Sequence, residues 1–295
     1  MTFNGKVRKA FSSQSTLMGE PEHCSLDPAQ LLAAGLAVGR QVRVRRDPAS
    51  VALYTISEDR PETDDSIVRM AKPGRTRLSA TGDEVEFAVS VDTQVPRSTL
   101  TDQEARTQSE FVERLTDDGV QKGLVVLAPH GGSIEHDTDR QAERVGEILG
   151  ADRSTVWLCR GFKQGGGAWE QWHITSSDID DVSFPLLGSI AHRSFEYAVA
   201  FHGFTEGDVL VGGGAARQLK KRIATAIQCA LAGTDIPVRI ARGSERFDGN
   251  NPRNIVNRLT EGGIGGVQIE QSSEARKDYW EQIAEAVAGV FNALK

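Results

Sequence analysis

The sequence predicts an α/β fold: a mixed, largely parallel sheet with helices on both faces, preceded by a small β-rich domain. Three observations support this fold class. Short apolar strands alternate with amphipathic helical segments after residue 99, a pattern typical of a parallel sheet. Before that point, short β-branched runs follow one another without helical periodicity. The length of 295 residues leaves room for both parts.

The N-terminal third divides into a leading region and a β-rich domain. Residues 1–25 are polar and aperiodic, so we expect them to be poorly ordered. Residues 26–98 begin with a short helix, because Asp27 followed by proline marks a helix start and a glycine ends the apolar run. Runs such as VALYTISE and VEFAVSVD then alternate with turn residues, including the Thr-Gly-Asp of 81–83. This spacing predicts a small antiparallel domain.

Residues 99–295 form the predicted α/β domain. It opens with a helix in which Thr101 and Glu104 have the spacing of a capping box, and Phe111 and Leu115 extend its apolar face. We then predict strands near 123–129, 154–160, 196–202, 236–240 and 265–270, interleaved with helices near 137–149, 215–232 and 274–294.

The composition excludes several classes of protein. A net charge of −7, without any long run of Lys or Arg, argues against a nucleic-acid partner. The three cysteines are widely spaced and odd in number, which predicts neither a disulfide framework nor a cysteine-based zinc site. The sequence shows no membrane-spanning apolar run and no signal peptide. We therefore expect a cytoplasmic protein with no membrane partner, and its oligomeric state stays open.

Two predicted strands end in histidine. The apolar run that starts at Leu124 ends in Pro-His-Gly-Gly, which places His130 at the strand end and Glu135 just beyond. The second strand, YAVAFHG, ends in His202. The glycines allow the backbone to fold so that imidazole and carboxylate converge. Carboxyl ends of strands in open α/β sheets are where sites form, so two histidines and one carboxylate there match a catalytic zinc site with three protein ligands.

A third strand ends in another acid. The run GGVQIEQ places Glu270 at its end, where a carboxylate is suited to act as general base toward a water on the zinc. Each of these residues also has a structural interpretation. A single histidine at a strand end is usually a hydrogen-bonded structural residue, and a glutamate there is commonly exposed. The coincidence of all four favours the metal site.

Six separated motifs between residues 120 and 295 resemble the phage-type poly-γ-glutamate hydrolase family. They are APHGGSIEHDTDRQA, WHITSSDID, YAVAFHG, VLVGGG, NPRNIVNR and GVQIEQSSEAR. The resemblance implies a zinc-carboxypeptidase-like fold and hydrolysis of the γ-amide bonds of poly-γ-glutamate. It implies one Zn²⁺ per chain held by His130, Glu135 and His202, with Glu270 as the base. The β-rich region lies outside the matching part.

The same resemblance suggests residues that bind the polyanionic substrate, because basic groups should line the cleft. Arginine pairs with carboxylates in bidentate fashion. The candidates are Arg253, Arg258, Arg276, Asn254, Asn257 and His173. Each has an alternative: the arginines could lie on a solvated helix face, the asparagines could cap a helical turn, and His173 could be a buried hydrogen-bonded residue.

Three functions are therefore compared. The first is a zinc-dependent hydrolase of γ-glutamyl amide bonds, acting through water bound to the metal. The second is a deacylase for an N-acyl amino acid, which a closed pocket would favour over a groove. The third is a phage- or replication-associated binding module without turnover. A non-catalytic module has no chemical need for His130, Glu135, His202 and Glu270 together, which favours the first.

Overall fold

The structure is a computed structural model that describes residues 1–82 and 84–294, so Asp83 of the predicted turn and Lys295 lie outside the described residues. The chain forms two compact units. The barrel unit contains Met1–Arg97 together with Gly167–Pro185, which we call the inserted segment. The sheet unit contains residues 98–166 and 186–294. The backbone therefore passes from one unit to the other three times.

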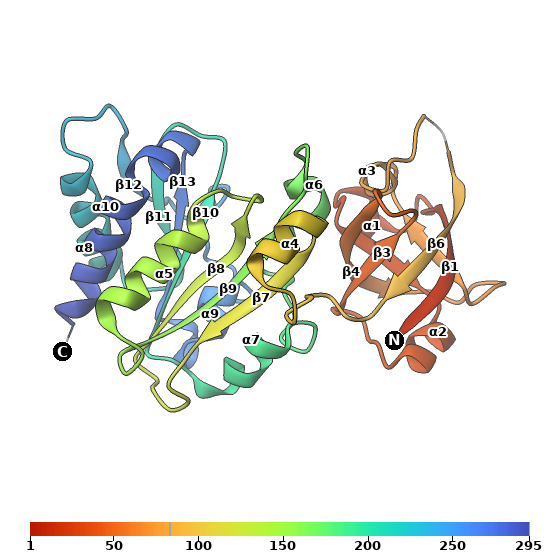
Figure 1. The fold of residues 1–295 in the computed structure, drawn as a ribbon, viewed down its shortest axis with the longest axis horizontal. Helices are drawn as coiled ribbons and strands as arrows, with labels where there is room; N and C mark the ends of the chain where they lie inside the picture. The colour runs from red at the N-terminus through yellow and green to blue at the C-terminus, as the bar shows by residue number, and fades with distance from the viewer. Residues whose placement is uncertain (83, 295) are drawn as a thin grey trace. The chain divides into compact units, whose positions relative to one another are not determined.

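The strands of the barrel unit form a closed barrel in the order β1-β5-β2-β4-β3-β6. Figure 1 labels four of these strands, β1, β3, β4 and β6. Its pairings are mostly antiparallel, as predicted, but β1 with β5 and β2 with β4 pair in parallel. Alternate side chains point inward and form an apolar core that includes Val42, Tyr54 and Val91. The elements are β1 (Thr2–Lys9), α1 (Ser15–Met18), β2 (His23–Leu26), α2 (Pro28–Ala34), β3 (Gln41–Arg45), β4 (Val51–Asp59), β5 (Ile67–Met70), α3 (Lys72–Thr76), β6 (Glu86–Asp92) and α6 (Ala168–Trp172).

The N-terminal region is ordered, contrary to the expectation for residues 1–25. β1 pairs with β6 along seven residues, from Thr2 opposite Asp92 to Arg8 opposite Glu86. β2 lies between β4 and β5. These partners are more than 30 residues away in sequence, so the local polar pattern of β1 gave no sign of them. The predicted helix start at Asp27 is confirmed, since its carboxylate accepts a hydrogen bond from Ala29 N at 2.7 Å.

The inserted segment packs on the barrel through polar contacts. Gln41 donates to the carbonyl of Asp178 at 2.6 Å, and its backbone N–H donates to the Ser183 hydroxyl at 2.9 Å. The Glu22 carboxylate accepts a hydrogen bond from Thr175 N at 2.8 Å and pairs with the His173 ring. Burial would raise the pKa of Glu22, but the interactions with His173, Arg77 and Thr175 N together outweigh burial and lower it to about 2. Residues far apart in sequence thus complete this unit.

The sheet unit is built on a seven-stranded sheet in the order β12-β11-β13-β10-β8-β9-β7 (Figure 1). Within the described residues, four neighbouring pairs are parallel, whereas β7 with β9 and β11 with β13 are antiparallel. The sheet is therefore mixed. Its elements are α4 (Asp102–Gln108), β7 (Phe111–Thr116), β8 (Leu124–Gly132), α5 (Thr138–Leu149), β9 (Ser154–Gly161), α7 (Pro185–Ile190), η1 (Ala191–Arg193), β10 (Tyr197–Gly203), β11 (Val209–Gly212), α8 (Arg217–Ala230), β12 (Val238–Ile240), α9 (Ile255–Arg258), η2 (Glu261–Gly263), β13 (Gly266–Gln271) and α10 (Ser273–Asn292).

The main core of the sheet unit lies between one face of the sheet and the helices α5, α8 and α10. Residues such as Val126, Phe201 and Ile269 contribute to it from the strands, and Ile223 and Val287 contribute from the helices. None of the helices in the described part of the chain combines the length and the apolar character that crossing a bilayer requires.

One predicted helix is shorter than expected. The capping box of Thr101 and Glu104 is present, but the helix ends at Gln108, where Ser109 adopts a left-handed conformation. Phe111 and Leu115 lie instead on β7, antiparallel to β9. The residues Phe111–Thr116 alternate in a way that suits a strand, and pairing with β9 decides between the two possibilities.

Candidate functional site

Three adjacent strands carry the predicted residues at their carboxyl ends. β10 pairs in parallel with β8 on one side and with β13 on the other. In this register His202 on β10 lies directly opposite Glu270 on β13, so their side chains share one face of the sheet. Val199 and Phe201 point into the main core, so His202 points to the opposite face.

A bulge in β8 directs His130 to that same face. Leu124, Val126 and Ala128 contribute to the main core, so strict alternation would turn His130 toward the core helices. The register of β8 against β9 shifts between Ala128 and Gly131. A bulge re-aims the side chains that follow it, and the proline at position 129 suits a place where the ladder is interrupted. The His130 ring consequently reaches His202.

Close packing and backbone conformation require glycine at both positions of the turn that follows His130. A Cβ on Gly131 would lie 2.5 Å from the Asp139 Cβ and 2.7 Å from the carbonyl oxygen of Cys159. Gly132 has φ of +73°, in the left-handed region that glycine favours. The turn is closed by Glu135 N, which donates to the His130 carbonyl at 2.8 Å. The convergence expected from the sequence is confirmed.

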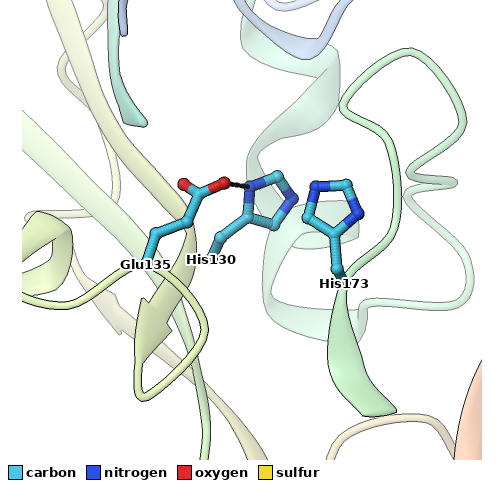
Figure 2. A group of neighbouring side chains, drawn as sticks. All are labelled: His130, Glu135 and His173. Atoms are coloured by element: carbon cyan, nitrogen blue, oxygen red, sulfur yellow. Dashed lines mark hydrogen bonds and ion pairs between the residues drawn. The ribbon is translucent and has the colours of Figure 1, made fainter. Parts of the chain in front are cut away.

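The ligand atoms of His130, Glu135 and His202 form a compact cluster. Figure 2 shows the Glu135 carboxylate facing the His130 ring, with Oε1 at 3.1 Å from Nδ1. His202 Nδ1 lies 3.2 Å from His130 Nδ1 and 3.5 Å from Glu135 Oε2. All three side chains are buried. Gly203 N donates to Glu135 Oε2 at 2.9 Å and fixes the carboxylate.

This geometry fits a single metal ion. Ligands at about 2.0–2.1 Å from a tetrahedral zinc lie roughly 3.4 Å from one another, close to the separations in the cluster. Two imidazole nitrogens that face each other can share at most one proton, whereas both can donate lone pairs to one cation. The ligand set of two histidines and one carboxylate is also a common one for catalytic zinc.

The charges of the two glutamates also fit a cation. Burial would raise the pKa of Glu135, but the adjacent imidazoles of His130 and His202 hold it well below its ordinary value. Burial, and then the negative charge of Glu135, raise the pKa of Glu270 to about 8. Two carboxylates therefore share a buried place in which a bound cation would stabilise both as anions.

A hydrogen-bond chain orients Glu270, and the sequence analysis did not identify it. Gln268 Nε2 donates to Glu270 Oε1 at 2.7 Å, and Asn254 Nδ2 donates to Gln268 Oε1 at 2.6 Å. Gln268 and Glu270 are two positions apart on β13, hence on the same face. A polar residue two positions before the acid in an otherwise apolar strand was the available signal.

Arg276 lies beside the cluster, on the first turn of α10. Its guanidinium occupies the space where a Cβ on Gly203 would be, so the glycine makes room for it. One nitrogen donates to the His136 carbonyl at 2.9 Å, and Nε donates to Gln271 O at 3.4 Å. Burial lowers the pKa of Arg276, whereas the nearby carboxylates, Glu135 most of all, oppose the shift.

The remaining predicted residues have other surroundings. Asn257 is buried, donates to the carbonyls of Gly249 and Asn251, and accepts from Gly214 N. Asn254 also caps α9 by accepting from Val256 N. Arg253 and Arg258 are exposed.

His173, which Figure 2 also draws, belongs to the inserted segment of the barrel unit and pairs there with Glu22. The substrate contacts of Arg253, Arg258, Asn254, Asn257 and His173 stay predictions.

Comparisons with known proteins agree with the motifs. A prophage-derived protein of Bacillus subtilis (strain 168), named SPbeta prophage-derived UPF0714 protein YoqZ, is 28% identical over 162 residues, which make up 54% of this chain and 52% of that protein. The chain thus spans about half the length of this curated relative.

Two solved structures are similar. A bacteriophage poly-gamma-glutamate hydrolase has 24% identity and a TM-score of 0.49, with 63% of this chain and 91% of that chain covered. A zinc-free apo form of YNDL has 22% identity and a TM-score of 0.51, with 65% and 96% covered. The likeness to YNDL supports a shared fold.

The family comparison covers the whole site. The model of the family described as poly-gamma-glutamate hydrolase matches residues 99–289. This range includes most of the sheet unit and every residue of the His130, Glu135, His202 and Glu270 cluster. Because the match spans well over half of the chain, the protein belongs to the poly-gamma-glutamate hydrolase family.

Proposed function

We propose that the protein is a zinc-dependent amide hydrolase that cleaves γ-glutamyl amide bonds, with one zinc ion per chain. The observation that carries this proposal is the buried cluster of His130, Glu135 and His202, with Glu270 opposite His202 on the next strand. Family membership supports a hydrolase, and the zinc-free description of the YNDL structure supports zinc as the metal.

His130 Nδ1, His202 Nδ1 and the Glu135 carboxylate would hold the ion. When bound, zinc supplies Lewis-acid chemistry: it polarises the amide carbonyl and makes water a stronger acid. The protein fixes the ligands in advance, because Gly203 N orients the Glu135 carboxylate and the β8 bulge orients His130. Pre-organisation of this kind reduces the cost of forming the site.

Glu270 acts as the general base in this proposal. Its carboxylate takes a proton from the attacking water, a C–O bond forms as the C–N bond breaks, and Glu270 passes the proton to the leaving nitrogen. The hydrogen bond from Gln268 occupies Oε1, so Oε2 is the oxygen available for the proton. A carboxylate is suited to this role only as an anion, which a neighbouring cation favours.

Arg276 is placed to stabilise negative charge on the substrate. Its guanidinium adjoins the cluster, and the hydrogen bonds to the His136 and Gln271 carbonyls use only part of its five donors. It suits either the oxyanion that develops during hydrolysis or a carboxylate of the glutamyl chain. Arg253, Arg258, Asn254, Asn257 and His173 are proposed as further substrate contacts on the strength of their motifs.

Substitution of Gly203 tests the role of Arg276 without removing it. In Gly203→Ala the new methyl group displaces the guanidinium, because the far end of a flexible side chain yields more easily than backbone. We expect kcat/KM to fall about 10–100-fold, as in Arg276→Ala, with little change in the melting temperature. Gly207→Ala is the control, since a Cβ there meets nothing within 4 Å. Wild-type kcat/KM in Gly203→Ala would remove Arg276 from the mechanism.

Metal removal tests the function as a whole. Chelation should abolish the release of glutamate from poly-γ-glutamate, and added zinc should restore it. Parallel assays with N-acyl amino acids and with α-linked polyglutamate separate a γ-specific hydrolase from a small-molecule deacylase or a general peptidase. Activity that survives complete removal of metal contradicts the zinc mechanism.

A further inference from the structure

A basic groove lies along the edge of the sheet unit, away from the cluster. It has a volume of about 700 Å³ and runs between helix α8 and the outermost strand β12. Its walls carry Arg217, Lys220, Lys221, Arg239 and Arg242, and none of its lining residues is acidic. The groove is polar as well as basic, because Thr225 and Gln228 also line it.

Most of this positive charge is not neutralised by neighbours. Arg239 pairs with Asp208 at 2.5 Å and with Glu245 at 2.9 Å. Among the described residues, the side chains of Arg217, Lys221 and Arg242 form no ion pair. In a chain of net charge −7, such a concentration of cations produces a local positive field that attracts anions.

The cations of α8 strengthen one another. Lys220 and Lys221 follow Arg217 by three and four positions, so the three side chains lie on one side of the helix. The Lys220 amine donates to Gly213 O at 2.7 Å. Burial and repulsion from Arg217 lower the pKa of Lys220, and the nearby negative charge of Asp248 opposes the shift. The positive end of the 14-residue helix dipole adds to the same field. An anion bound here relieves this repulsion.

The groove is separate from the proposed hydrolytic site. β12 is two strands away from β13, which corresponds to roughly 10 Å across the sheet. β11 and β12 run antiparallel to β13, so Arg239 lies level with Glu270, two strands away, whereas Arg242, just after β12, lies toward the opposite end of β13. A small substrate bound at the cluster does not extend to this groove, whereas a sufficiently long polyanion can reach both sites.

We propose that the groove between α8 and β12 is a secondary binding site for the carboxylates of a long γ-glutamyl polymer, which it holds while another part of the same polymer is cleaved. The proposal rests on the proposed function. Once one part of a polymer is bound in the groove, the rest of the same polymer is present at a high effective concentration near the hydrolytic site. The groove should therefore lower KM for long polymers and leave short substrates unaffected.

The test compares two triple variants with the same change in charge. Arg217→Gln, Lys221→Gln and Arg242→Gln remove cations from the groove, whereas Lys122→Gln, Arg153→Gln and Arg222→Gln remove exposed cations elsewhere in the sheet unit. Binding is measured by fluorescence anisotropy with labelled poly-γ-glutamate at low salt. Hydrolysis is measured for the same polymer and for short γ-glutamyl oligomers.

We expect the groove variant alone to lose about tenfold in affinity and to show a matching rise of KM for the polymer, with kcat/KM for short oligomers unchanged. Equal affinity in both variants, with hydrolysis retained, overturns the groove and leaves the hydrolase. A wild-type protein that neither binds nor cleaves the polymer overturns both proposals. If duplex DNA displaces the labelled polymer at lower concentrations than unlabelled poly-γ-glutamate does, the groove is assigned to nucleic acid instead.

Discussion

His202→Ala protein is expected to contain almost no zinc, whereas wild-type protein reconstituted with zinc contains about one ion per chain. Zinc binding free energies of about 10–16 kcal/mol, shared among four ligands, correspond to roughly 2.5–4 kcal/mol for each ligand. The affinity should fall at least about 100-fold, and hydrolysis should be lost with it. The measurement is elemental analysis after dialysis, on protein purified without a metal-binding tag.

His192→Ala is the matched control for this substitution. His192 is exposed on the short helix η1, away from the cluster, so its removal should leave both metal content and activity unchanged. Equal zinc in the wild type and in His202→Ala contradicts the assignment of His202 as a ligand. The absence of metal from the wild type, even after reconstitution, would favour the hypothesis of a non-catalytic binding module over that of a hydrolase.

Glu270→Gln is expected to lower kcat about 10²–10⁴-fold while zinc stays bound. Glutamine keeps the shape of the side chain and can still accept the hydrogen bond from Gln268, so the fold should be preserved. It cannot take up the proton from water. Metal content and hydrolysis are measured on the same sample, which separates the loss of the base from the loss of the metal.

Glu274→Gln provides the control for the charge change. Glu274 is exposed in the first turn of α10, four positions beyond Glu270. Its kcat should equal that of the wild type. Full activity in Glu270→Gln would show that another group accepts the proton, and loss of zinc from that variant would show that Glu270 supports the metal instead.

The strand ends of the candidate site could be predicted because their signal is local. Apolar runs of strand length that end in His-Gly identify where His130 and His202 lie, and the preference of α/β sheets for sites at that edge brings them together. Glu270 followed from the same argument. The exact opposition of His202 and Glu270 could not be derived, since it depends on which strands are neighbours in the sheet.

The bulge in β8 and the hydrogen-bond chain to Glu270 could not be predicted from local sequence patterns. Alternation alone directs His130 to the wrong face, and only the pairing of β8 with β9 shows that the register shifts. Gln268 orients Glu270 together with Asn254, which comes from a separate loop. In both cases the decisive contact joins segments whose proximity is a product of the fold.

The barrel illustrates the same limit at a larger scale. β1 is a polar run that becomes a strand because β6, more than 75 residues later, offers a partner. The apolar residues of Phe111–Thr116 fit both the helical and the strand period, and the sequence analysis predicts a helix. Pairing with β9 at the edge of the sheet makes the segment a strand. Non-local pairing overrides local preference in both.

The inserted segment links the order of synthesis to the order of folding. A growing chain has made all barrel strands once Asp92 is complete, yet Glu22 and Gln41 find their hydrogen-bond partners in the inserted segment only after residues 167–185 have emerged. By then β8, α5 and β9 have already been synthesised. A fragment of residues 1–97 alone would therefore contain all six barrel strands but lack the hydrogen bonds that the inserted segment gives to Glu22 and Gln41.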